Sequence, residues 1–188
     1  ELNDVKKVEV IKEDINQAHI IKGWLVPTYG EADYPAIVLL NIILGASGLS
    51  SRLFAELRDK RGLAYVVRSS YETYKLAGNF MIYIATEPKN IQTSLDGFDK
   101  EIEKIKTTLV SEEELNNAKT NVVGKYELLE ETNIQQACSY AKYDVLGLGF
   151  NYSQNLKEQV QTITTQDILR CAQKYFDGDK YVLSVIEP

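Results

Sequence analysis

The sequence has few of the residues that most often bind metals or act as nucleophiles. It contains a single histidine, His19, among 188 residues, so a zinc signature built on two histidines, such as HxxEH, cannot form within it. A Ser-His-Asp triad would have to use His19, which lies in an expected strand, and the sequence has no nucleophile-elbow motif. We therefore interpret His19 as a structural residue.

Cysteine is also scarce. Cys138 and Cys171 are the only two, and each falls on the apolar side of an expected helix. We expect two small buried side chains rather than a disulfide or a metal-binding pair. This usage mildly favours a reducing compartment, so we expect a cytoplasmic location, while periplasmic and organellar locations stay open.

Long apolar runs and an excess of positive charge are absent. No run approaches the length of a membrane-spanning helix, and 27 acidic against 21 basic residues give a net charge of −6. A surface of this sign repels nucleic acids and anionic membranes unless its cations cluster, so neither is an expected partner. No signal peptide precedes Glu1 and the chain has no initiator Met. We expect residues 1–188 to be a single domain excised from a longer two-domain chain.

The hydrophobic pattern predicts an α+β fold, with a mostly antiparallel sheet and helices packed on one face. A period of two marks the strands, and steps of three and four residues mark the helices. Strands come early, helices follow as a block and one strand returns at the end, an order typical of this class. The expected strands are residues 5–11, 18–26, 63–74, 79–86 and 181–188, and the expected helices are residues 33–44, 51–60, 91–109, 111–129, 133–148 and 164–177.

Capping residues set several of these boundaries. Side chains with an oxygen acceptor precede four of the expected helices, where they can bind the free N–H groups of the first turn. These predicted caps are Asp33, Ser51, Ser111 and Thr164, the last two paired with Glu114 and Asp167. Gly62 is predicted to end the helix at residues 51–60 and to turn the chain into the following strand.

Residues 44–74, LGASGLSSRLFAELRDKRGLAYVVRSSYETY, are the most distinctive stretch of the sequence. The pattern places Phe54 toward the core and Tyr65 on one strand face with Val67. Arg58 and Tyr65 lie on either side of Gly62 and can converge. A permanently charged guanidinium beside a phenol supplies donors suited to a carbonyl or a developing oxyanion. The residues alone equally allow a solvated Arg58 at a helix end and a half-buried Tyr65.

The segment LGASGLSSRLFAELRDKRGLAYVV resembles the C-terminal-type domain of the pitrilysin, insulinase and mitochondrial-processing-peptidase family of zinc metallopeptidases. The most specific part of the likeness is SSRLF-x-x-LR-x-x-x-G-x-x-Y. Three flanking segments are similar in spacing and type, so the resemblance covers most of the chain: GWLVPTYGEADYPAIVLLNIIL, GNFMIYIATEP and SEEELNNAKTNVVGKYELLEE.

The resemblance implies two related α+β domains that close on a chamber. One domain carries an HxxEH zinc site, and the other supplies an Arg and a Tyr that fall on Arg58 and Tyr65 here. It implies that this pair is catalytic and substrate-binding, reaching the peptide backbone near the scissile bond while zinc polarises the carbonyl and activates water. This chain would then be the half without zinc, inactive alone, and partnered by an HxxEH-bearing domain or subunit and a peptide substrate. A homodimer or heterodimer, the compartment and the peptide specificity stay open.

Two other functions are compatible with parts of the sequence. The first keeps the fold and makes the chain a non-catalytic structural or partner subunit, although the presence of both Arg58 and Tyr65 favours a catalytic role. The second is nucleic-acid binding, because the turn at residues 45–48, GASG, mimics the GXXG loop of a KH domain. The negative net charge and the absence of a basic residue in the turn weigh against it.

Overall fold

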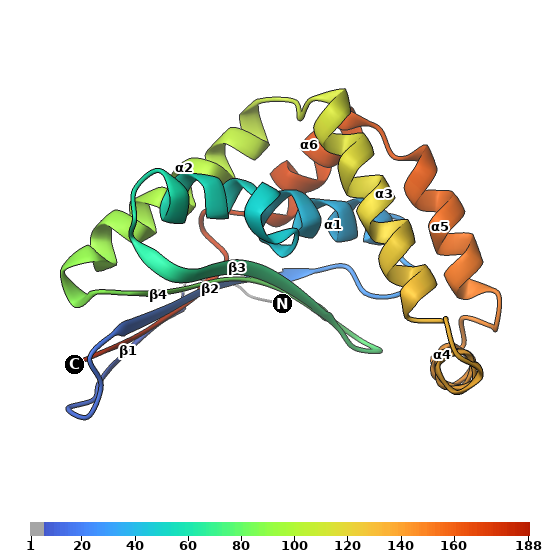
Figure 1. Cartoon of the computed structure of the whole chain (residues 1–188), viewed down its shortest axis with the longest axis horizontal. Coiled ribbons are helices and arrows are strands. Elements are labelled where there is room, and N and C mark those ends of the chain that lie inside the picture. The colour runs from blue at the N-terminus through green and yellow to red at the C-terminus, as the bar shows by residue number, and fades with distance from the viewer. Residues whose placement is uncertain (1–5) are drawn as a thin grey trace.

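A five-stranded sheet forms the base of the structure, a computed structural model that describes residues 6–188. The strand order is β1-β5-β2-β4-β3, in which β1 runs parallel to β5 and the other neighbours are antiparallel. The strands are β1 (Lys6–Ile11), β2 (Ala18–Val26), β3 (Ala64–Thr73), β4 (Gly78–Thr86) and β5 (Val182–Glu187). The helices lie on one face of this sheet (Figure 1). The predicted α+β fold is therefore confirmed, while Val5, placed in the first strand, lies outside the described residues.

Helices fill the chain between the strands and after β4. The longer ones are α1 (Tyr34–Asn41), α2 (Ile91–Thr107), α3 (Glu112–Leu128), α4 (Asn133–Val145), α5 (Tyr152–Thr162) and α6 (Thr165–Tyr175). Three short helical turns lie between α1 and β3, namely η1 (Ile42–Ala46), η2 (Gly48–Ser50) and η3 (Phe54–Asp59), and a fourth, η4 (Pro88–Asn90), precedes α2. Among the described residues, no helix is both long enough and apolar enough to cross a membrane.

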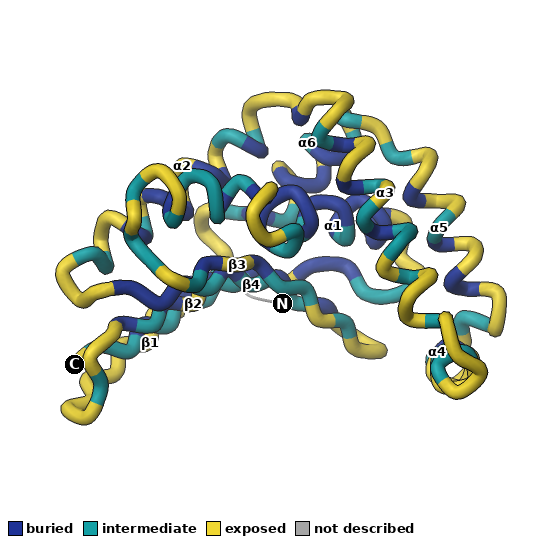
Figure 2. Tube along the Cα trace, in the orientation of Figure 1, coloured by how far each residue is buried: buried dark blue, intermediate teal, exposed yellow. Residues whose placement is uncertain are grey.

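The core lies between the sheet and the helices. Strand β2 alternates as the sequence predicts, and Ile20, Trp24 and Val26 are buried on its helical side. Trp24 packs on Phe176 with ring centroids 5.2 Å apart, and its indole N–H donates to the Asp177 carbonyl at 3.1 Å. Helix α1 is apolar on nearly every side and is correspondingly buried (Figure 2). The sheet face and α1 together hold the helical turns that carry the site.

Helix α5 was not predicted, and its pattern shows why. Its buried apolar residues form one row at four-residue steps, Tyr152, Leu156 and Val160, and Ser153 is the other buried residue. No side chain caps its first residue, because Asn151 makes no capping hydrogen bond. A single apolar row without an N-cap is a weak indication of a helix in the sequence. Packing against the neighbouring helices supplies the stability that the local sequence lacks.

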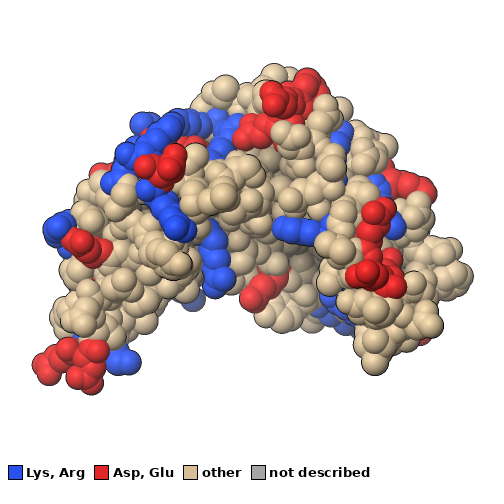
Figure 3. All heavy atoms as spheres, in the orientation of Figure 1, with Lys and Arg blue, Asp and Glu red and all other residues tan. Residues whose placement is uncertain are grey.

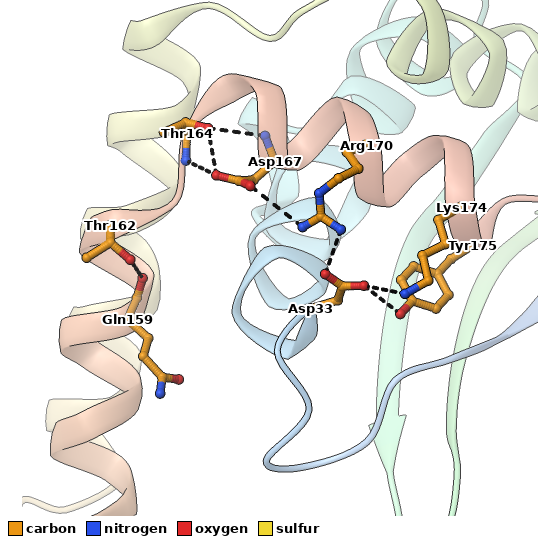
Figure 4. A network of polar contacts seen from close by, with 8 residues as sticks. All are labelled: Asp33, Gln159, Thr162, Thr164, Asp167, Arg170, Lys174 and Tyr175. Carbon is orange, nitrogen blue, oxygen red and sulfur yellow. Dashed lines mark hydrogen bonds and ion pairs between the residues drawn. The ribbon is translucent and has the colours of Figure 1, made fainter.

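Asp33 holds the N-cap position of α1 as predicted, but the capping hydrogen bond expected of its side chain is not formed. Its carboxylate instead accepts hydrogen bonds from Arg170 Nη1 at 2.8 Å, Lys174 Nζ at 2.7 Å and Tyr175 Oη at 2.8 Å, all on α6 (Figure 4). Burial opposes its ionisation, but these three donors outweigh that effect and hold the pKa of Asp33 well below its usual range. Partners distant in the sequence thus replace the local cap.

The other predicted caps divide in the same way. Thr164 forms the full capping box with Asp167, so that prediction is confirmed. Ser111 accepts from the Glu114 N–H at 3.1 Å, yet the Glu114 side chain turns away to bind Arg52. Ser51 does not cap a helix, because its hydroxyl donates to the Gly48 carbonyl at 2.7 Å.

The two cysteines do not share one environment. Cys171 is fully buried on α6, as predicted. Cys138 is exposed on α4, so the prediction of a buried side chain is wrong there. Helix α4 lies at the edge of the molecule with only Tyr143 buried (Figure 2). An amphipathic pattern shows which side of a helix is apolar, but the depth of its burial depends on what packs against it.

Candidate functional site

Arg58 and Tyr65 are brought together, as the sequence predicts. Arg58 lies in the last turn of η3, and Tyr65 lies near the start of β3. The guanidinium carbon of Arg58 is 4.8 Å from the centre of the Tyr65 ring and 4.7 Å from that of the Phe54 ring. A guanidinium at this distance from aromatic rings is attracted to their faces. The two rings therefore fix the direction of the Arg58 side chain.

Gly62 supplies the turn that makes this contact. Its φ is +61°, a left-handed conformation that side chains other than glycine adopt at a cost. The Gly62 N–H donates to the Arg58 carbonyl at 2.9 Å, and the Leu63 N–H donates to the Leu57 carbonyl at 2.9 Å. The bond from the Gly62 N–H to the Arg58 carbonyl is the one that an αL cap makes at a helix C-terminus. The predicted end of the helix at Gly62 is therefore confirmed.

Tyr65 occupies a special position in β3. Ala64 pairs with Thr86 and Val66 with Ala85, so Tyr65 is the extra residue of a bulge. Its side chain is 78% exposed, and the prediction that it shares a face with the buried Val67 is wrong. A bulge redirects the side chain of the extra residue. Here the redirected phenol points to the same open surface as Arg58.

Arg58 differs from the other basic side chains of residues 51–61, namely Arg52, Lys60 and Arg61, in having no acidic partner. Arg52 forms a two-pronged pair with Glu114 at 2.7 and 2.6 Å, and Arg61 pairs with Glu56 at 3.0 Å. Within residues 6–188, the Arg58 side chain has no ion pair and no hydrogen bond. Its five N–H donors thus stay available to a ligand.

The pair borders an open hollow of about 440 Å³ between the helical turns and β3. Basic side chains lie in the middle of this face of the molecule (Figure 3). The lining residues are Gly45, Ala46, Gly48, Phe54, Arg58 and residues 65–70. Phe54 and Arg68 were not predicted as site residues. Phe54 was expected in the core, although its position four residues before Arg58 on a helix could have indicated the contact.

Gly45 holds the wall of this hollow close to the strand. A Cβ atom at Gly45 would lie 2.1 Å from the Ser69 backbone nitrogen, so only glycine permits the approach. Both η1 and η3 are π-helical turns, a rare geometry that is frequent at functional sites. Because Gly45 is buried against β3, the turn at residues 45–48 is not a free loop of the GXXG type.

Zinc has no fitting ligands in the part of the chain that the structure describes. No group of three or more His, Cys, Asp or Glu side chains is placed to hold a metal ion there. The single histidine, His19, shares a hydrogen bond of 2.9 Å between its Nδ1 and the Tyr83 hydroxyl. The described residues therefore present a donor-rich surface and no metal centre.

Comparison with known proteins identifies the family. Residues 2–122, well over half of the chain, match the family model of the peptidase M16 inactive domain. The chain belongs to the M16 peptidase family. The resemblance carried by the stretch around Arg58 and Tyr65 is thereby confirmed, and the chain corresponds to the domain that this family model describes as inactive.

Relatives of this M16 domain are longer proteins. "Uncharacterized zinc protease YmxG" of Bacillus subtilis is 28% identical over 94% of this chain, which spans 43% of that protein. "Probable inactive metalloprotease YmfF" of the same species is 28% identical over 97% of this chain and 42% of that protein. A protease structure from Helicobacter pylori superposes with a TM-score of 0.90 at 23% identity, covering 100% of this chain and 45% of that one, which supports the fold. The M16 domain thus spans less than half the length of these proteins.

Proposed function

We propose that this M16 domain is the substrate-binding half of a zinc-dependent metalloendopeptidase. A zinc ion would belong to an HxxEH-bearing domain or subunit, because the described residues here offer no ligand set for it. When bound there, it would supply Lewis-acid chemistry at the peptide carbonyl. Relatives carrying the name zinc protease support this assignment.

The observation that carries the proposal is the unpaired guanidinium of Arg58 beside the exposed Tyr65. Phe54 and Tyr65 hold the guanidinium from two sides, and within residues 6–188 no acid neutralises it. Fixed donors that face an open surface are suited to the carbonyl oxygens of an extended peptide. They stabilise the charge that develops on one such oxygen when water attacks it. We therefore assign Arg58 as a catalytic and substrate-binding donor, with the Tyr65 hydroxyl as a second donor.

Substitutions in the assembled enzyme test the assignment. Arg58→Ala is expected to lower kcat/KM for a quenched fluorescent peptide by about 10²–10³-fold, the effect of losing one oxyanion donor. Tyr65→Phe is expected to lower it with the fold intact, because only a hydroxyl is removed. Arg61→Ala is the matched control: this nearby arginine is paired with Glu56, so its loss should change kcat/KM about twofold or less. Unchanged cleavage in both Arg58→Ala and Tyr65→Phe would overturn the assignment.

A structural role is the second candidate, and one relative favours it, since YmfF carries the name probable inactive metalloprotease. Comparing three samples separates the two functions: this chain alone, the chain joined to its HxxEH-bearing half, and the joined protein with a zinc chelator. Chelator-sensitive cleavage only by the joined protein supports the peptidase. No cleavage by any sample, with the two halves still associating, supports the structural role.

A further inference from the structure

A second cavity lies beside the first, on the other side of η1. It has a volume of about 300 Å³. Its lining is unusual in combining phenol rings with ammonium groups and no carboxylate. The polar side chains that line it are Tyr29, Tyr34, Asn41, Tyr71, Thr73, Lys125, Tyr126, Lys142 and Tyr143.

The two lysines of this cavity have only uncharged partners. Lys125 Nζ donates to the Ala46 carbonyl at 3.2 Å, and Lys142 Nζ donates to the Tyr29 hydroxyl at 2.8 Å. Within residues 6–188 neither lysine forms an ion pair, although the chain has more acids than bases. Burial lowers the pKa of Lys125. Two cations that face one cavity and lack an anion leave a site for an anion to occupy.

The tyrosines add neutral donors to this positive site. Burial raises the pKa of Tyr126 above its usual range and that of Tyr143 to about 12, so both phenols keep their protons at neutral pH. A carboxylate accepts such O–H and N–H donors through two oxygens. Two acids act on the group from outside its lining: Glu130 contributes to the raised pKa of Tyr143, and Glu31 contributes to that of Tyr71. Glu31 is not among the residues that line the cavity. Glu130 does not line the cavity and pairs with neither lysine.

Strand β3 connects the two cavities. Its residues 65–70 line the first, and Tyr71 and Thr73 line the second. The strand is the last in the sheet order, so in the described residues no strand pairs with its outer edge. An extended peptide lying along β3 from Tyr65 would pass Tyr71 and Thr73 six to eight residues later. At about 3.3 Å per residue this distance is roughly 20–26 Å.

We propose that the cavity of Lys125 and Lys142 is a subsite for a carboxylate of the bound peptide, six to eight residues from the bond held at Arg58 and Tyr65. The inference rests on the proposed function, since it needs a peptide at that pair. The carboxylate comes either from an acidic side chain or from the C-terminus of the peptide. Both present the same two oxygens to the lysines and phenols.

Fluorescence anisotropy with this chain tests the subsite without any cleavage. The probes are fluorescein-labelled peptides of Ala, Thr and Gln that carry one Glu at a different position in each, compared with the same peptides carrying Gln there. A second set varies peptide length and ends in a free acid or an amide. Peptides with Glu at one set of positions, or free-acid peptides of one length, should bind about tenfold or more tightly than their neutral counterparts. This is the gain expected from one charge-assisted hydrogen bond.

Four variants locate that gain. Lys125→Gln and Lys142→Gln should each abolish the preference for the acid while binding the neutral peptide as before. Lys119→Gln is the matched control, because Lys119 lies on the same helix, donates to the Gln161 carbonyl at 2.9 Å and is outside the cavity. It should leave the preference unchanged. Thermal unfolding of each variant checks that the fold persists, and Lys125→Arg should retain most of the gain.

The outcomes separate the subsite from the proposed function. Arg58→Ala should weaken binding of acidic and neutral peptides alike, by about tenfold or more. If it does so but the domain binds no acidic peptide more tightly than its neutral counterpart, the subsite is wrong and the peptide-binding role stands. A preference that survives both lysine substitutions also overturns the subsite. If no peptide binds, or Arg58→Ala has no effect, the proposed function fails, and the subsite fails with it.

Discussion

Replacing Asp33 by asparagine should destabilise the domain at neutral pH by an amount that shrinks in acid. Asp33 is buried, with 8% of its surface exposed, and its carboxylate accepts three hydrogen bonds from side chains of α6. A hydrogen bond to a charged group contributes about 1.5–3 kcal/mol. Two of the donors, Arg170 and Lys174, are 52% and 57% exposed, so solvent screening reduces their share. Asparagine at position 33 would also place an N–H₂ group, which cannot accept a hydrogen bond, against the donor side chains of α6. We expect a loss of about 2–3 kcal/mol at pH 7.

The pH dependence follows from the lowered pKa of Asp33. A carboxyl group whose pKa is lower in the folded than in the unfolded protein stabilises the fold fully above its ordinary pKa of about 3.9. The contribution is lost as the pH falls through the folded-state value. The difference in stability between wild type and Asp33→Asn should therefore be constant from pH 7 to about 5 and narrow below about pH 4. Other acids affect both proteins equally and cancel in the difference.

Urea unfolding followed by tryptophan fluorescence measures this difference. Trp24 is the only tryptophan, and it packs on Phe176, which directly follows the helix that binds Asp33. Glu87→Gln is the control, because Glu87 and Lys89 form a pair with side chains 63% and 76% exposed, and it should change stability by about 0.5 kcal/mol or less. Equal stability of wild type and Asp33→Asn at pH 7, or a difference that persists undiminished at pH 2, would refute the reasoning.

Two further predictions concern single sites. In the folded protein, Ellman's reagent should modify the exposed Cys138 rapidly and Cys171 only after unfolding, because burial raises the pKa of Cys171 to about 12; two fast thiols would contradict the packing of α6. Gly45→Ala should lower the free energy of unfolding by about 3 kcal/mol or more, because its Cβ would clash with the backbone of Ser69. Gly48→Ala, where φ is +66° and the space is open, should cost only about 1 kcal/mol, and equal losses in urea unfolding would show that the close approach is not limiting.

Local signals were sufficient for much of the fold and for the central pair. The change from helical to strand periodicity around Gly62 predicted the turn, and with it the meeting of Arg58 and Tyr65. The bulge that exposes Tyr65 was out of reach, because it depends on how β3 pairs with β4. The close packing of α2 on η3 was also out of reach: a Cβ at Gly97 of α2 would lie 2.2 Å from the Leu57 side chain.

Long-range polar partners account for the capping hydrogen bonds that were predicted at Asp33 and Glu114 but do not form. Asp33 carries a good local capping signal, but its three donors come from α6, near the other end of the chain. Glu114 likewise leaves its capping box for Arg52 on a separate segment. No spacing rule connects residues so far apart. For the same reason the sequence did not indicate that Lys125 and Lys142 face one cavity.

The strand order has a consequence for how the domain is made. Strand β5 is the latest in the sequence, yet it lies inside the sheet between β1 and β2. It is the strand that holds β1, whose six described residues pair with β5. During synthesis at about 5–20 residues per second, β1 therefore waits on the order of ten seconds or more for its partner. Until then β1 pairs with no other described strand on either edge, and the edge of β2 that β5 will cover stays open, so the docking of β5 is the step that closes this side of the sheet.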